Sequence, residues 1–121
     1  MELKALGYDF TVCKLRGLDD IRLSPDICFI GVTDEEISLV CRTENTPADT
    51  LAREDGWRGF KIMGELDFSL TGILAGISKV LADNEIGIFA VSTYNTDYVL
   101  VKKENFDRAL YALSKSGYSV I

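Results

Sequence analysis

The second half of the chain alternates between two hydrophobic periods, and this alternation constrains the fold most. Apolar residues occupy every second position of residues 60–66, which is the period of a β-strand. A helical period follows, with one apolar face formed by Leu70, Ile73, Leu74, Ile77, Val80 and Leu81. Strand-like runs at 86–91 and 98–101, an amphipathic segment at 106–113 and a short run at 118–121 complete the pattern. The predicted order is strand, helix, strand, strand, helix, strand.

This order is typical of the split βαβ plan, in which two helices cover one face of an antiparallel sheet. We therefore predict an α+β fold with a ferredoxin-like βαββαβ domain at residues 60–121. Residues 1–59 contain strand-like runs at 8–15, 27–32 and 37–41, with an acidic turn at 34–36. We expect a vestigial helix around residues 18–23 and a short helix from Thr46-Pro47 to about residue 53. Residues 1–59 are thus predicted to be a degenerate copy of the same plan, sharing strand 60–66 with the domain at 60–121.

Composition excludes several function classes. The chain has no histidine, which is the commonest general base and metal ligand, so we expect no catalytic site, no metal site and no cofactor. Net charge is −6, and residues 1–59 contribute most of it through 7 basic and 12 acidic side chains. An acidic surface repels phosphate backbones, so we expect no nucleic-acid partner.

The chain also lacks the signals of a membrane or secreted protein. No run approaches the ~20 apolar residues of a membrane helix, and the N-terminus has no secretion-signal pattern. We therefore expect a cytoplasmic protein without a membrane partner. Three cysteines, Cys13, Cys28 and Cys41, lie among apolar neighbours and form no CxxC motif. We interpret them as reduced core residues.

Residues 70–101, LTGILAGISKVLADNEIGIFAVSTYNTDYVLV, resemble the ACT-domain proteins of bacteria. The motifs TGIL, LA, IFAVSTYNTDY and LV carry the resemblance, which covers residues 60–121, whereas residues 1–59 match only in layout. The similarity is closest to the subgroup whose tandem modules resemble the arginine sensors of the CASTOR type. Thr71 replaces a common proline and Gly87 a common asparagine. The resemblance implies a non-catalytic, small-molecule-sensing regulatory module that acts through homodimerisation or a separate partner protein.

Two polar segments are the candidate ligand-binding site. One lies at the predicted helix start, where free amide groups and Gly72 suit a ligand carboxylate. The other joins two strands, and there Asp97 would pair with an ammonium or guanidinium group while neighbouring hydroxyls and an amide orient the ligand. Together they complement an amino acid. The predicted set is Ser69, Leu70, Thr71, Gly72, Ile73, Ser92, Thr93, Tyr94, Asn95, Thr96 and Asp97.

Structural roles for the same residues stay open. Gly72 also suits close packing of helix on sheet, Asn95 suits turn geometry, and Asp97 suits a turn cap. The alternative for the whole protein is a ligand-free interaction or assembly domain. An enzyme is disfavoured, because neither Glu65 with Asp67 nor the Lys102–Lys103 pair is joined by a second convergent catalytic group.

Overall fold

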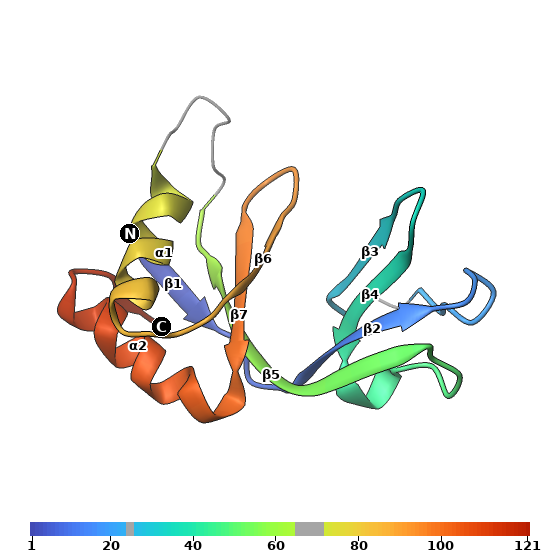
Figure 1. The fold of residues 1–121 in the computed structure, drawn as a ribbon. Coiled ribbons are helices and arrows are strands. Elements are labelled where there is room, and N and C mark those ends of the chain that lie inside the picture. The colour runs from blue at the N-terminus through green and yellow to red at the C-terminus, as the bar shows by residue number, and fades with distance from the viewer. Residues whose placement is uncertain (24–25, 65–71) are drawn as a thin grey trace. The chain divides into compact units, whose positions relative to one another are not determined.

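A computed structural model describes residues 1–23, 26–64 and 72–121, and divides the chain into two units (Figure 1). Unit 1 consists of Met1–Gly7 and Arg58–Ile121, and unit 2 of Tyr8–Trp57. One long strand, β5 (Ala52–Ile62), begins in unit 2 and ends in unit 1. The first seven residues therefore belong with the C-terminal part of the chain.

Unit 1 contains a mixed sheet with the strand order β6-β7-β5-β1-β8. Its elements are β1 (Glu2–Ala5), the end of β5, α1 (Ile73–Asp83), β6 (Phe89–Ser92), β7 (Asp97–Lys102), α2 (Phe106–Lys115) and β8 (Ser119–Val120). The predicted α+β class and the alternation of strands and helices after residue 60 are confirmed. Strand β1 was not predicted. It lies between β5, to which it is antiparallel, and β8, to which it is parallel.

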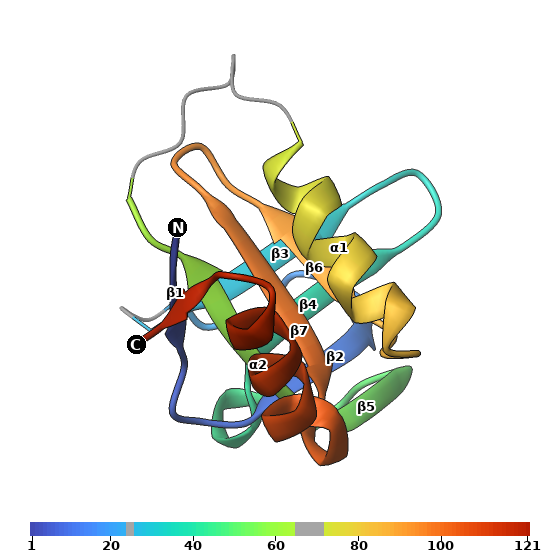
Figure 2. The same cartoon turned by 90° about the vertical axis from the view of Figure 1, so that its left-hand side faces the viewer.

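Both helices of unit 1 lie on one side of its strands (Figure 2). The predicted apolar faces fill the space between helices and sheet, and each buried Leu, Ile, Val or Phe side chain stabilises the fold by roughly 1.5–3 kcal/mol. The buried cluster is Leu3, Phe60, Ile62, Ile77, Leu81, Ile86, Val99, Val101, Phe106, Ala109 and Leu113.

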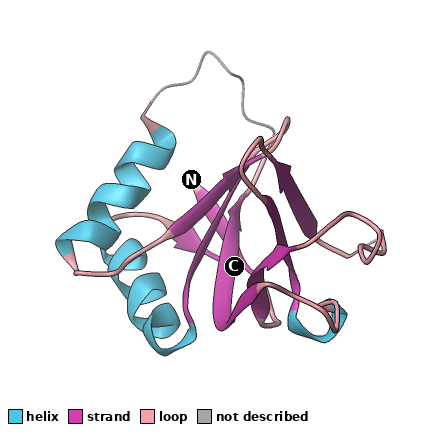
Figure 3. Ribbon diagram, turned by 45° about the vertical axis from the view of Figure 1, so that its right-hand side comes forward, coloured by secondary structure: helices cyan, strands magenta, loops and turns pink. Residues whose placement is uncertain are grey.

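Unit 2 contains an antiparallel sheet with the order β3-β4-β2-β5, and its described residues form no α-helix. The helical turn that Figure 3 draws in this unit is a 3₁₀-helix. Its strands are β2 (Phe10–Leu15), β3 (Cys28–Val32), β4 (Ile37–Arg42) and the start of β5, with the 3₁₀-helix η1 (Thr43–Asn45) after β4. The predicted strands are confirmed, but both predicted helices are wrong. Residues 18–20 form a turn, and only six residues, including Pro47, separate η1 from β5, too few for a stable α-helix.

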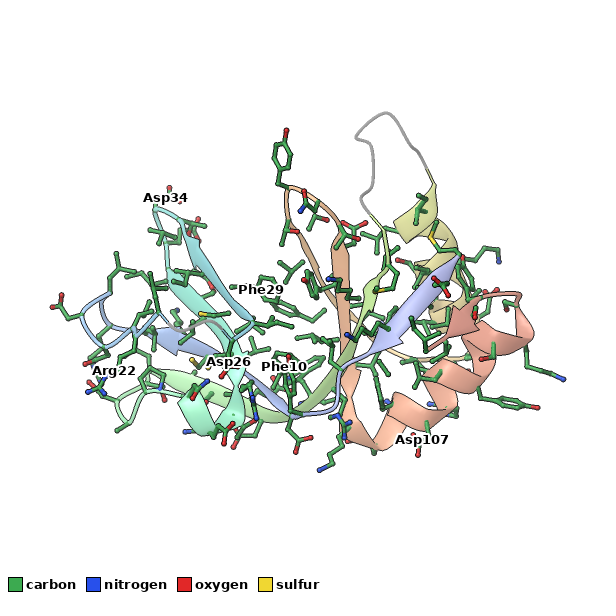
Figure 4. All side chains as sticks on the ribbon, turned by 180° about the vertical axis from the view of Figure 1, so that it is seen from behind. Phe10, Arg22, Asp26, Phe29, Asp34 and Asp107 are labelled. Atoms are coloured by element: carbon green, nitrogen blue, oxygen red, sulfur yellow. The ribbon has the colours of Figure 1, made fainter. Side chains whose placement is uncertain are left out.

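The two faces of the unit 2 sheet differ in chemistry. One face holds Cys13, Leu15, Leu39 and Cys41, against which Ile21 from the loop after β2 packs. The opposite face presents aromatic residues, and Figure 4 shows Phe10 and Phe29 on the same side of this sheet. The loop that carries Ile21 thus covers part of this face, whereas helices cover one face of the sheet in unit 1. Figure 4 also shows Asp34 at the predicted acidic hairpin tip.

The units contain an internal repeat with a constant spacing of 60 residues. Strands β3 and β4 and η1 in unit 2 correspond to β6, β7 and η2 (Lys103–Asn105) in unit 1. Glu44-Asn45 matches Glu104-Asn105, and the residue before each 3₁₀-helix has the same backbone geometry, φ −57° and ψ 139° at Arg42 and φ −60° and ψ 140° at Lys102. The second copy continues into α2, whereas the first meets Pro47 and continues into β5.

A β-bulge marks the place where β5 leaves unit 2. The β2–β5 register shifts between Phe10 and Val12, and Gly56 has the left-handed φ of +82°. A glycine in this conformation is typical of a bulge with one additional residue. Beside it, the buried Thr11 hydroxyl donates a hydrogen bond of 2.7 Å to Asp55. This bond, followed by those from Arg53, lowers the pKa of the Asp55 carboxyl.

Gly59 in β5 leads to the first prediction, because a methyl group at this position would meet the Leu100 side chain and approach the Val99 carbonyl oxygen to 3.0 Å. Gly59→Ala should lower the free energy of unfolding by about 1–3 kcal/mol, as overpacked cores do. Gly31→Ala is the matched control, since its nearest neighbour there is Ser38 Cβ at 4.0 Å. Urea unfolding measures both, and equal stability of the two variants would contradict the packing described.

Candidate functional site

One end of unit 1 brings the β6–β7 hairpin and the start of α1 to the same side (Figures 1 and 2). These are the segments that contain the predicted site residues. Ser69, Leu70 and Thr71 lie outside the described residues. Gly72, Ile73 and residues 92–97 are described, so the geometry of the site rests on them.

No side chain of the described residues caps the first turn of α1. Gly72 is the N-cap residue, with the left-handed φ of +80°, and its carbonyl accepts a hydrogen bond of 2.9 Å from the Gly76 amide. The amides at the beginning of an α-helix have no partner within the helix and carry a partial positive charge. The end of α1 at Ile73 is therefore suited to an anionic group.

Gly72 is required for conformation rather than for close packing. A Cβ at Gly72 would meet no atom of the described residues within 4 Å, but the positive φ disfavours any other residue. The proposed role in packing helix against sheet is thus not supported at this position. At Gly76, in contrast, a Cβ would lie 3.0 Å from the Tyr118 hydroxyl oxygen, so this glycine permits a close approach of α1 to Tyr118.

The β6–β7 hairpin places Ser92 directly opposite Asp97. The Ser92 hydroxyl donates a hydrogen bond of 2.5 Å to Asp97 Oδ1. The half-buried carboxylate is thereby held in a fixed orientation at the end of the strand pair. An oriented carboxylate has lost part of its side-chain freedom in advance, which favours binding of a cation.

The turn between the strands is closed by Thr93 and Thr96. The Thr93 amide donates to the Thr96 carbonyl oxygen at 2.8 Å, and the Thr93 hydroxyl donates to the same oxygen at 3.0 Å. Tyr94 and Asn95 occupy the tip, and Tyr94 is 78% exposed. The hydroxyl of Thr93 thus supports the turn, whereas the side chains of Tyr94 and Asn95 extend into solvent.

Thr96 fastens the hairpin to the sheet. It is 5% exposed, and its hydroxyl donates a hydrogen bond of 2.7 Å to the Ile62 carbonyl oxygen at the end of β5. This hydroxyl was predicted to orient a ligand. In the structure its hydrogen bond is made within the fold, because a buried hydroxyl needs a partner and the Ile62 carbonyl provides one. Thr96 is therefore an anchor of the hairpin.

A hollow in unit 2 was not predicted from the sequence. It has a volume of about 650 Å³ and lies between the loops at 19–22 and 44–49. Its lining has four acidic side chains and one basic side chain. Unit 2, with eleven acidic and five basic side chains, accounts for the whole net charge of −6. The two loops share no motif and lie far apart in sequence, so no local pattern indicates the hollow. Among the described residues, no group of three or more Cys, Asp or Glu is arranged to hold a metal ion.

Comparisons with known proteins agree with this architecture. Residues 52–115, more than half of the chain, match the family model of the ACT domain. The crystal structure of protein Atu0741 from Agobacterium tumefaciens is similar to this chain, with a TM-score of 0.88 and 31% identity over 99% of this chain and 91% of that one.

No helix of the described residues is long and apolar enough to cross a membrane.

More distant structures share the fold alone. The regulatory subunit of aspartate kinase from Thermus thermophilus has a TM-score of 0.67 at 11% identity, with 95% of this chain and 96% of that one covered. Protein VC0802 from Vibrio cholerae has the same TM-score at 19% identity, over 94% of this chain and 88% of that one.

The anchoring role of Thr96 predicts a loss of stability in Thr96→Val. The variant keeps the shape of the side chain but leaves the Ile62 carbonyl without its donor, which should cost about 1–3 kcal/mol. Ser92→Ala is the control, because the Ser92 side chain is exposed and its truncation should change the free energy of unfolding by less than about 1 kcal/mol. Urea unfolding of both variants decides the point. A Thr96→Val protein as stable as Ser92→Ala would show that the buried bond contributes little.

Proposed function

Because this chain belongs to the ACT domain family, we propose that it is a non-catalytic regulatory module that senses a small molecule, and that it binds an amino acid at the hairpin end of unit 1. One observation carries the proposal. The amides at the start of α1 and the oriented carboxylate of Asp97 lie at the same end of the unit, so a partial positive charge and a carboxylate charge are presented together.

The chemistry of an amino acid fits these two groups. The ligand carboxylate would accept hydrogen bonds from the amides at the start of α1, where Ser69, Leu70 and Thr71 are proposed to add further donors. The ligand ammonium, or the guanidinium of an arginine, would pair with Asp97. The exposed Tyr94 and Asn95 at the hairpin tip are proposed to contact the remainder of the ligand.

The output of such a module is proposed to be its own homodimerisation or binding to a separate protein in the cytoplasm. Strand β3 supports this proposal. It terminates the strand order of unit 2, contains no charged residue or proline, and exposes Ile30 and Val32 by 40% and 60%. Natural edge strands are usually protected by charges or proline, and an unprotected edge favours pairing with another chain.

A second candidate function is a ligand-free interaction domain, and the hairpin itself favours it. The hydroxyls of Ser92, Thr93 and Thr96 all make hydrogen bonds within the hairpin or to β5. Of the described site residues, Asp97, the exposed tip and the start of α1 are the groups that the first proposal assigns to the ligand. That this chain shares the arginine specificity of the CASTOR-type sensors likewise stays a prediction.

A thermal-shift experiment distinguishes the two functions. The protein is melted with each of the twenty amino acids at millimolar concentration. A ligand at 100 times its Kd should stabilise the fold by about 2.7 kcal/mol. Asp97→Ala should abolish this shift and remain folded, whereas Glu104→Ala, which removes an exposed carboxylate of η2, should retain it. If no amino acid shifts the melting temperature, the ligand-free interaction domain is the better account. If the shift is unchanged in Asp97→Ala, the ligand binds at a place that does not include Asp97.

A further inference from the structure

The three cysteines of unit 2 lie on neighbouring strands and on one face of the sheet. Cys28 in β3 is directly opposite Cys41 in β4, and Cys41 is opposite Thr11 in β2. Because side chains alternate between the faces of a strand, Cys13, two residues after Thr11, shares the face of Cys41. All three are free thiols in the structure.

Hydrogen bonding in the β3–β4 hairpin determines how closely Cys28 and Cys41 approach. The Thr33 amide donates to the Glu36 carbonyl at 2.9 Å, so this pair is a hydrogen-bonded one. Hydrogen-bonded and non-hydrogen-bonded pairs alternate along an antiparallel ladder. The regular register from Val32 opposite Ile37 to Cys28 opposite Cys41 therefore makes the cysteines a non-hydrogen-bonded pair.

A non-hydrogen-bonded pair is the arrangement that suits a cross-strand disulfide. Its Cα atoms are about 4.5 Å apart, and disulfides span Cα separations of about 4.4–6.8 Å. A non-hydrogen-bonded pair of the second hairpin, which corresponds to Val32 and Ile37, illustrates the closeness, since Ser92 and Asp97 bring their side-chain oxygens to 2.5 Å. Cys13 is instead diagonal to Cys41, at a separation of about 7–8 Å, too far for a disulfide without backbone movement.

We propose that Cys28 and Cys41 are a reversible oxidation site, at which a peroxide converts the two thiols to a disulfide that cross-links β3 to β4. Cys28 is half-buried, whereas Cys41 and Cys13 are only 3% and 4% exposed, so Cys28 meets the oxidant first. Its sulfur is oxidised to a sulfenic acid as the peroxide O–O bond breaks and one water is released. The Cys41 sulfur then attacks the Cys28 sulfur, and the hydroxyl leaves as a second water.

The neighbours of Cys41 are consistent with its role as the resolving thiol. The Cys41 sulfur lies 3.7 Å from the Thr46 hydroxyl oxygen, a weak hydrogen bond that favours the thiolate. Burial raises the pKa of both thiols, so the thiolate is scarce at neutral pH and the reaction is slow. The site accordingly responds to sustained rather than brief exposure. The proposal is independent of the amino-acid site in unit 1.

Peptide mapping of the full chain tests the proposal. The reduced protein is treated with hydrogen peroxide, the remaining thiols are alkylated, and the protein is digested without reduction. No Lys or Arg lies between the two cysteines, so trypsin leaves both in the peptide 23–42, and cleavage after Glu35 and Glu36 then separates them. We expect two fragments joined by a disulfide that dithiothreitol breaks, with Cys13 alkylated.

Variants provide the controls. Cys13→Ser should form the same cross-link in the same yield, whereas Cys28→Ser and Cys41→Ser should form none. Oxidation of the wild-type protein should raise its urea midpoint, and oxidation of Cys28→Ser should not. A Cys13–Cys41 link, a covalent dimer through Cys28, oxidation of Cys28 to the sulfinic acid alone, or no oxidation would each overturn the proposal. The peptide map of the oxidised wild-type protein tests the proposal even if a variant fails to fold.

Discussion

One strand, β5, pairs with strands of both units, and the rest of the structure depends on how it does so. Its first residues pair with β2 in unit 2, and its last three pair with β1 in unit 1. A strand presents alternate residues to opposite faces, so a shift of one residue exchanges the faces. The bulge at Gly56 makes such a shift. Before it, Asp55 contacts Thr11 on one face of the sheet. After it, Trp57 is paired with Phe10, whose side chain lies on the opposite face.

The same building unit supports different chemistry in the two hairpins. Positions that hold Ser92 and Asp97 in unit 1 hold Val32 and Ile37 in unit 2, so the polar pair is replaced by an apolar one. The position of the buried Thr96 is occupied in unit 2 by the exposed Glu36, whose carboxylate accepts a hydrogen bond of 2.6 Å from the Ser38 hydroxyl. The unit 1 tip is therefore anchored to the sheet, while the unit 2 tip is exposed.

The second half of the chain was predictable because its signals are local. Helices α1 and α2 and strands β6 and β7 each show their own period. The start of β5 shows none, because Arg53, Glu54 and Asp55 are polar and exposed, and that stretch joins the sheet by backbone pairing with β2. Strand β1 was missed for a similar reason: it is four residues long, and Leu3 is its one fully buried residue.

The candidate site was predictable only as a list of polar residues. The run at 92–97 indicates a polar hairpin, and its residue types indicate what it can bind. Which hydroxyls the fold itself uses depends on partners that no local pattern reveals. Thr96 bonds a backbone carbonyl 34 positions earlier in the chain, and a carbonyl group is common to every residue. The internal repeat was predicted from the layout of its strands alone, since few residue identities accompany the matched elements.

The central claim, an amino-acid site at the hairpin end of unit 1, is tested most directly by nuclear magnetic resonance. Uniformly ¹⁵N-labelled protein is titrated with the amino acid that most stabilises it, or with an equimolar amino-acid mixture if none does. We predict saturable amide shifts concentrated at residues 72–75 and 92–97. Shifts concentrated in the unit 2 loops at 19–22 and 44–49, or no saturable shift at all, would contradict the account.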